Sequence, residues 1–186
     1  KMVNSSFEIF FSGHRGKTAY KGSCYDEKNY PCLKKIINDD FIIMPWFGYI
    51  DIKQFMPLPQ FKKSEIVVKK YIENTLQNFK NNSIRFIEPL PQFINPLGSG
   101  LPLLNIEDRY PHQKQYIEQL RDQCQKLGLE KPINISDILS TDLLSESFEC
   151  HNCKDCLSPE YVKFKLDHPK KEYFKKIIDE IIKKYI

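Results

Sequence analysis

Asp167 and His168 stand directly before Pro169 and the amphipathic segment at the end of the chain. Histidine titrates nearest to neutral pH, so it can take a proton from a nucleophile and pass it to a leaving group. Several α/β hydrolytic folds carry their general base at the start of the last helix. We therefore expect hydrolytic chemistry at His168, with Asp167 as its companion. The alternative is a histidine that only caps the final helix.

Three of the six cysteines cluster shortly before that pair: Cys150, Cys153 and Cys156, with His151 between the first two. Zinc prefers four sulfur and nitrogen ligands in a tetrahedron, and C-x₂-C turns supply such ligands. These residues predict a structural zinc site that would fix the loop before His168. A second C-x₂-C half is missing. Two alternatives to zinc are therefore a disulfide within the cluster and free thiols. An iron–sulfur site is a further alternative, although no fourth cysteine lies nearby to complete it.

A glycine-containing segment near the N-terminus suggests phosphate binding as a further alternative. Gly13 and Gly16-Lys17-Thr18 follow an apolar run, as in a P-loop whose backbone amides surround a phosphate. The spacing G-x₄-G-K-T would place glycine at position 11, which is Phe11. A nucleotide kinase is therefore the weaker hypothesis.

The pattern of apolar residues predicts the elements that would position these groups. Short apolar runs bounded by turn residues predict strands at residues 6–11, 41–47, 83–88 and 133–135. Apolar residues at helical spacing predict helices at residues 64–79, about 112–127 and 169–186. Residues 20–32 are polar and are expected to form a loop.

Several details of these elements follow from their end residues. The run 41–47 is expected to be buried on both faces, as in a parallel sheet, and Gly48 closes it. Ser64 is expected to be the N-cap of its helix, with Glu65 in the first turn. Gly128 is expected to end the second helix.

The order of the elements predicts the fold class. Strands that are separated by helices imply right-handed crossovers and a parallel sheet with helices on both faces. We therefore expect an α/β protein with three layers, α/β/α, around a mainly parallel sheet, flavodoxin-like in type. In such sheets the functional site lies outside the carboxyl ends of the strands.

Composition limits the classes of partner. The 186 residues are 41% hydrophobic and 28% charged, with a formal net charge of +4, which is ordinary for a globular domain. No dense Lys/Arg block is interleaved with aromatic residues, so no nucleic-acid partner is expected. No run approaches the ~18 apolar residues of a membrane span, and no signal-peptide core opens the chain. We expect an intracellular or virion-like protein with one domain over residues 1–186.

Four segments in this order resemble the SGNH (GDSL-like) hydrolase family from its second block onward. The strand at 6–11 leads to Gly13 and Gly16, which resemble the second block. Residues 47–51 (Phe-Gly-Tyr-Ile-Asp) resemble the third block, the strand that begins near residue 84 follows, and Asp167-His168-Pro169 resemble the fifth. The resemblance covers roughly residues 6–186 and implies an SGNH-like α/β domain. Its N-terminal strand and serine block would lie before Lys1 or be absent.

Three positions depart from the family pattern. No Gly-Asp-Ser motif occurs in the chain, so a nucleophilic serine would have to lie upstream of Lys1. Ile50 occupies the position of the asparagine that donates to the oxyanion. Lys165 stands three residues before His168, where the family has aspartate.

The resemblance implies an ester hydrolase that acts on an acylated carbohydrate or a similar oxygen ester. His168 would be its base, the Gly16 amide an oxyanion donor, and Gly48 and Asp51 part of the pocket. For Asp51 the alternative is a turn or N-cap residue. No cofactor is required besides the structural zinc suggested above. The competing hypothesis is a non-catalytic relative, whose cleft binds a glycan or a protein within a larger assembly.

Overall fold

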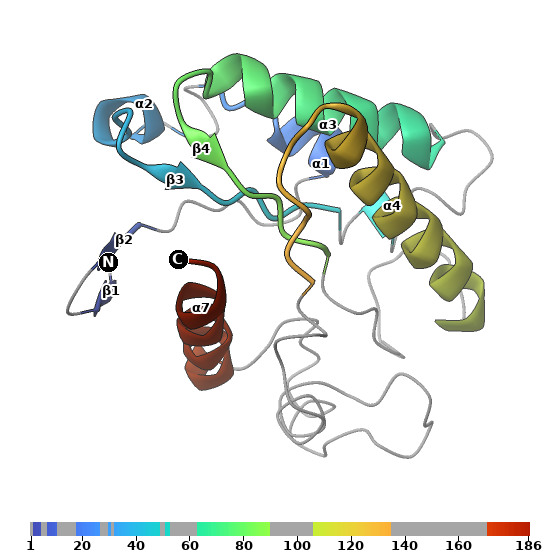
Figure 1. The fold of residues 1–186 in the computed structure, drawn as a ribbon. Helices are drawn as coiled ribbons and strands as arrows, with labels where there is room; N and C mark the ends of the chain where they lie inside the picture. Colours follow the sequence, from blue (N-terminus) through green and yellow to red (C-terminus); the bar gives the residue numbers. More distant parts are fainter. Residues whose placement is uncertain are drawn as a thin grey trace.

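The computed structural model describes residues 2–4, 7–10, 18–26, 30, 32–48, 51–52, 63–89, 106–134 and 171–186 (Figure 1). These segments form a mixed α/β structure. Its elements are β1 (Met2–Asn4), β2 (Phe7–Ile9), α1 (Ala19–Gly22), α2 (Leu33–Ile36), β3 (Ile42–Ile43), α3 (Ser64–Asn78), β4 (Ser83–Ile84), α4 (Ile106–Lys126) and α7 (Lys171–Tyr185). Among the described segments, no helix combines the length and the apolar character that a membrane crossing needs.

Strands β3 and β4 form a small parallel sheet, with Ile42 opposite Ser83. The pairing continues beyond the strand ends, because the amide of Ile87 donates to the carbonyl of Pro45. On its other side Ile87 forms a parallel bridge with Ile133. Residues 83–88, called the middle strand below, thus lie between residues 42–45 on one side and Ile133 on the other. Among the described residues this sheet has the two strands β3 and β4, and Ile133 joins it by an isolated bridge. Residue 135 of the strand predicted at 133–135 lies outside the described residues.

The predicted burial of 41–47 on both faces is wrong. Ile42 is 40% exposed, five other residues of the run are partly exposed, and Pro45 is its one buried residue. Gly48, directly after the run, is also buried. The sheet is therefore best covered near the carboxyl ends of its strands, where α1 and α4 lie (Figure 1).

The predicted strand at 6–11 exists as β2, but its place in the parallel sheet was wrong. β2 pairs antiparallel with β1, with Met2 opposite Ile9, in a separate two-stranded sheet. Only residues 5 and 6 separate the two strands, and antiparallel strands can pair across so short a connection whereas parallel strands cannot.

The predicted loop over residues 20–32 was wrong at its beginning, because α1 occupies Ala19–Gly22. Thr18 is the N-cap, and its hydroxyl accepts a hydrogen bond from the amide of Lys21 at 3.1 Å. Threonine is a favoured N-cap residue, so Thr18 was a local signal for this helix.

Helix α3 follows its apolar pattern closely. Its inward face is formed by Val67, Val68, Tyr71, Ile72 and Thr75, all of them buried. Glu65 lies in the first turn as expected, but the N-cap is Lys63, one residue before the predicted Ser64.

Helix α4 begins earlier than predicted, at Ile106, and contains Pro111. At its other end Gly128 has φ +66°. The amide of Leu129 donates to Cys124 and that of Gly128 donates to Gln125, which is the Schellman arrangement. Leu127, the predicted last residue of this helix, lies one residue beyond its end and is 52% exposed, because the chain already turns away there.

The main core lies where α1, α3, α4 and the middle strand meet. Its buried residues are Ala19, Ile52, Val67, Val68, Tyr71, Ile72, Phe86, Tyr116, Leu120 and Cys124. The rings of Tyr71 and Phe86 meet edge to face, with centroids 5.1 Å apart, a favourable geometry for aromatic pairs.

Helix α7 buries Ile178, Ile181 and Ile182, whose spacing forms one stripe on a helix. In Figure 1, α3 lies above the strands β3 and β4 and α7 lies below them. The final predicted helix is thus confirmed over Lys171–Tyr185.

Candidate active site

Helix α1 packs directly against the chain that leaves β3. Ala19 and Gly22 are buried, and a Cβ atom added at Gly22 would collide with the ring of Phe47. The absence of a side chain at Gly22 therefore allows the close approach between α1 and Phe47. Together with the hydrogen bond of Ala19 to Asp51, it places α1 beside Phe47, Gly48 and Asp51.

Asp51 links these two segments by a buried hydrogen bond. Its Oδ2 atom accepts from the amide of Ala19 at 2.6 Å, and the residue is 2% exposed. Burial raises the pKa of Asp51 to about 6, against the opposing effect of the amides of Ala19, Asp51 itself and Tyr20. A carboxylate in this position satisfies free amides at the start of a helix. The contact observed for Asp51 is therefore that of a cap on α1.

Gly48 lies at the start of the same turn, and the amide of Ile52 donates to its carbonyl at 3.0 Å. Its φ of +111° favours glycine. A Cβ atom there would lie 2.6 Å from Cζ and 2.8 Å from Oη of Tyr116. Gly48 is thus required both by backbone conformation and by the tyrosine against it.

Tyr116 of α4 completes the group of residues around this turn. It is fully buried, and burial together with the charge of Asp51 and the neighbouring Tyr25 raises the pKa of its hydroxyl well above the ordinary value. We call Ala19, Gly48, Asp51 and Tyr116 the turn cluster. It joins α1, the exit of β3 and α4 at the carboxyl end of the sheet.

An ion pair at the end of the middle strand was not foreseen from the sequence. Arg121 donates to Glu88 through Nε at 2.6 Å and Nη2 at 2.9 Å. The Glu88 side chain is 3% exposed and that of Arg121 is 39% exposed. The available signal was an acidic residue at the end of a buried strand together with an arginine beside the buried stripe of α4.

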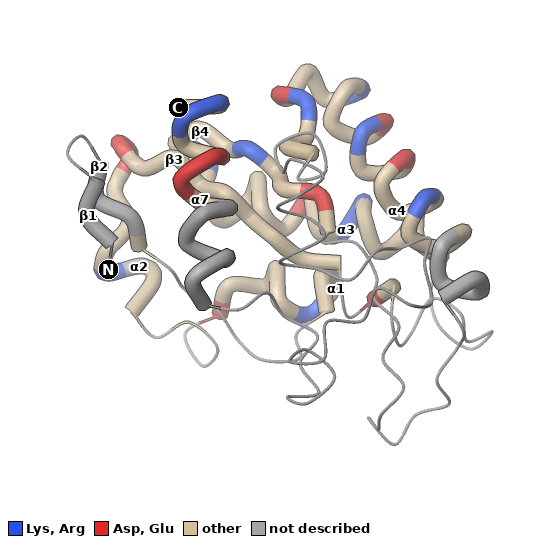
Figure 2. Tube along the Cα trace, turned by 90° about the horizontal axis from the view of Figure 1, so that it is seen from below, with Lys and Arg blue, Asp and Glu red and all other residues tan. Residues whose placement is uncertain are grey.

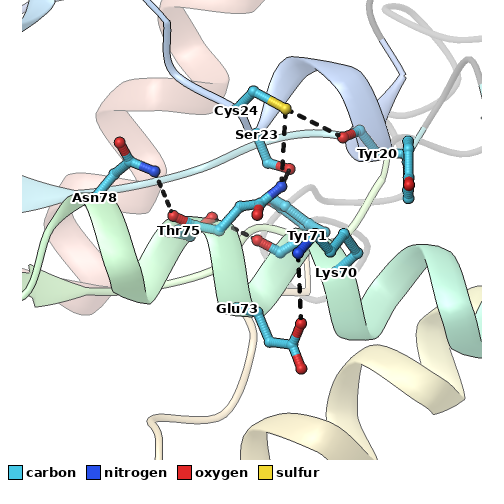
Figure 3. A network of polar contacts seen from close by, with 9 residues as sticks. Tyr20, Ser23, Cys24, Lys70, Tyr71, Glu73, Thr75 and Asn78 are labelled. Atoms are coloured by element: carbon cyan, nitrogen blue, oxygen red, sulfur yellow. Dashed lines mark hydrogen bonds and ion pairs between the residues drawn. The ribbon is translucent and has the colours of Figure 1, made fainter.

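A second polar network attaches the segment after α1 to α3 (Figure 3). Asn74 donates to the hydroxyl of Ser23 at 3.2 Å, and the hydroxyls of Tyr25 and Thr75 share a hydrogen bond of 3.2 Å. Thr75 itself donates to the carbonyl of Tyr71 at 2.8 Å. These buried polar groups satisfy one another, so segment 18–26 is fixed on the side of α3 as well as at Asp51.

The outer surface of α4 carries both signs of charge. Basic and acidic residues alternate along this helix in Figure 2, and Lys114 lies 4.0 Å from Glu118. Mixed charges of this kind form weak exposed pairs.

The remaining predicted site residues lie outside the described part of the chain. They are Gly16, Cys150, His151, Cys153, Cys156, Asp167 and His168. Within the described residues no group of three potential metal ligands occurs, and the three cysteines described there, Cys24, Cys32 and Cys124, are unpaired. The helix that follows Lys17-Thr18 has four residues, and the glycines and the lysine of the nucleotide-kinase alternative lie outside the described residues.

Comparison of the chain with protein-family models, with curated proteins and with solved structures finds no match to any of them.

Proposed function

We propose that the protein is an SGNH-type ester hydrolase that acts on an acylated carbohydrate or a similar oxygen ester. The observation that carries the proposal is the hydrogen bond between Asp51 and Ala19, which are 32 residues apart. Ala19 follows the glycines that resemble the family's second block, and Asp51 ends the segment that resembles the third. A shared active site would need these two segments in contact.

The surrounding architecture supports the same proposal. Gly48 and Glu88 follow neighbouring parallel segments, and α/β sheets carry their sites outside such strand ends. The positions of α3 and α7 on opposite sides of β3 and β4 (Figure 1) agree with the three-layer arrangement that the family would have. In that arrangement the segment before α7 would bring His168 to the site.

The chemistry would be acyl transfer to a serine upstream of Lys1. His168 takes the proton of the serine hydroxyl while the serine oxygen forms a bond to the carbonyl carbon of the ester. The tetrahedral intermediate then expels the alcohol, to which His168 returns the proton, and water removes the acyl group by the same route. Backbone amides, including that of Gly16, would stabilise the oxyanion. Ile50 supplies no side-chain donor, a loss typically worth ~10²–10³ in turnover.

The decisive experiment is fluorophosphonate labelling of the natural full-length protein, followed by mapping of the labelled peptide. We expect labelling at a serine outside residues 1–186 and its loss in His168→Ala. His112→Ala, a variant of a partly buried histidine on α4, is the matched control and should label normally. His168→Ala should keep its unfolding free energy within ~1 kcal/mol of wild type.

Two results would overturn the esterase. Folded full-length protein that does not label would favour the competing proposal, a binding module of the same fold that lacks catalysis. A His168→Ala variant that labels normally, or that loses label only because it unfolds, would assign His168 to helix capping. The absence of Gly-Asp-Ser and the isoleucine at position 50 are the features that favour this competitor.

A further inference from the structure

The buried ring of Tyr116 lies against a residue that has no side chain. The Cβ position of Gly48 would be 2.6, 2.7 and 2.8 Å from Cζ, Cε1 and Oη of Tyr116. The hydroxyl end of the ring, rather than its flat centre, therefore meets the turn that carries Asp51. Because packed interiors leave few gaps, the ring limits how far this turn can move toward α4.

No hydrogen bond of the Tyr116 hydroxyl to the described residues explains why the side chain lies here. The oxygen is buried, and within the described part of the chain no hydrogen-bond partner reaches it. A buried hydroxyl without a partner is unfavourable, and buried tyrosines usually find one. The shape of the ring is thus the feature that the turn uses.

Helix α4 is a firm support for that ring. Leu120 and Cys124, one and two turns along from Tyr116, are fully buried in the main core. Arg121 adds the paired hydrogen bonds to Glu88 at the end of the middle strand. The ring of Tyr116 is therefore held in place by contacts that do not involve the turn.

We propose that Tyr116 is a positioning residue for the candidate active site. Its ring holds Gly48, and through it Asp51, at the depth at which the Asp51 carboxylate accepts the hydrogen bond from the amide of Ala19. Tyr116 itself touches no reacting atom. The effect on catalysis rests on the proposed esterase function, whereas the effect on the Asp51–Ala19 contact does not.

A residue that serves only as core filling would give a different result. Removing an ordinary core side chain lowers the stability of the whole domain, so all amides that exchange by global unfolding become exposed together. A positioning residue instead changes a local opening, which amide hydrogen exchange can separate from global unfolding. The amide of Ala19 reports directly on the contact, because its hydrogen is donated to Asp51.

The test is NMR-detected hydrogen exchange of the full chain under native conditions, with the ratio of the Ala19 rate to the rates of buried α3 amides as readout. In Tyr116→Leu we expect this ratio to rise by about tenfold or more. Tyr116→Phe, which keeps the ring, should leave the ratio at its wild-type value. Leu120→Ala is the matched control, because it removes a core side chain one turn away on the same helix. It should leave the ratio unchanged or lower it, because a lower global stability speeds the α3 amides at least as much as that of Ala19. Gly48→Ala displaces the turn from the opposite side and should raise the ratio if Tyr116→Leu does not fold.

The proposal is overturned if Tyr116→Leu folds and its ratio stays at the wild-type value. If Tyr116→Leu does not fold, a wild-type ratio in Gly48→Ala overturns the proposal. It is also overturned if Tyr116→Phe raises the ratio as much as Tyr116→Leu, since the hydroxyl would then be the active group.

Fluorophosphonate labelling of the same variants separates the two proposals. Slower labelling of Tyr116→Leu than of Leu120→Ala is expected. Absence of labelling in wild type removes the esterase but leaves the exchange test valid.

Discussion

The guanidinium of Arg121 and the carboxylate of Glu88 are joined by two hydrogen bonds of 2.6 and 2.9 Å between residues 33 positions apart. Two parallel bonds from one guanidinium fix direction as well as distance. The pair therefore sets the position of α4 against the end of the middle strand. The ring of Tyr116 meets Gly48 from the same helix.

Removing the guanidinium should destabilise the fold clearly. In Arg121→Ala the buried Glu88 carboxylate loses its charged partner, and we expect a loss of about 2 kcal/mol in unfolding free energy. The measurement is urea denaturation. Lys114→Ala, which breaks an exposed pair with Glu118, is the control and should stay within about 0.5 kcal/mol of wild type. Equal effects of the two substitutions would show that the Glu88–Arg121 pair contributes no more than a surface contact.

Asp51 should make stability depend on pH in the weakly acidic range. Its pKa is about 6 in the folded protein against an ordinary value of 3.8, so the folded state binds the proton more tightly. The stabilisation is complete below pH 3.8 and is lost as the pH rises through about 6. Its upper limit is about 3 kcal/mol, from about two units of pKa.

The substitution that tests this is Asp51→Asn, which keeps an oxygen for the amide of Ala19 but cannot ionise. Unfolding free energies of both proteins are measured from pH 4 to pH 7. As the pH rises, the wild type should lose stability relative to Asp51→Asn. Asp40→Asn removes the same charge from an exposed position and is the control. A difference for Asp51→Asn that does not vary with pH would contradict the buried, proton-binding aspartate.

At Gly22, replacing glycine by alanine should lower the stability of the protein, whereas the same change within a helix usually raises it. Alanine is normally more stable than glycine within a helix by about 0.5–1 kcal/mol, but at Gly22 its Cβ would collide with the ring of Phe47. We expect Gly22→Ala to destabilise the protein by about 1–3 kcal/mol. Adding Phe47→Leu to Gly22→Ala should recover part of this loss. Gly128→Ala supplies the contrast, because nothing lies within 4 Å of its Cβ position and only its φ of +66° opposes alanine. A stabilised Gly22→Ala variant would contradict the close contact.

The segment that carries Cys150, His151, Cys153 and Cys156 should bind one zinc ion. Protein prepared under reducing conditions should contain about one equivalent of zinc by elemental analysis. Cys153→Ala should lose this zinc, whereas Cys32→Ala, which removes an exposed thiol outside the cluster, should retain it. Reduced protein without metal would leave a disulfide or free thiols as the state of Cys150, Cys153 and Cys156.

Local sequence was sufficient for the elements that carry a periodic apolar face. The pattern of Val67, Val68, Tyr71 and Ile72 placed α3, and Gly128 marked the end of α4. These features depend on side chains within a few residues of each other, which propensity and periodicity describe directly. The same reasoning missed α1 and predicted a loop there, because a four-residue helix is too short for a period to be visible.

The contacts that define the candidate site could not be predicted in this way. Sequence marked Gly48 and Asp51 as pocket residues, but gave no reason to pair Asp51 with Ala19, Tyr116 with Gly48 or Arg121 with Glu88. It also placed the strand at 6–11 in the parallel sheet, whereas β2 pairs with β1. The sequence by itself determined the helices that carry a periodic apolar face and which residues could do acid–base or metal chemistry. Tertiary structure alone decided which of them meet, because a carboxylate or a ring is buried only when segments tens of residues apart exclude water from it together.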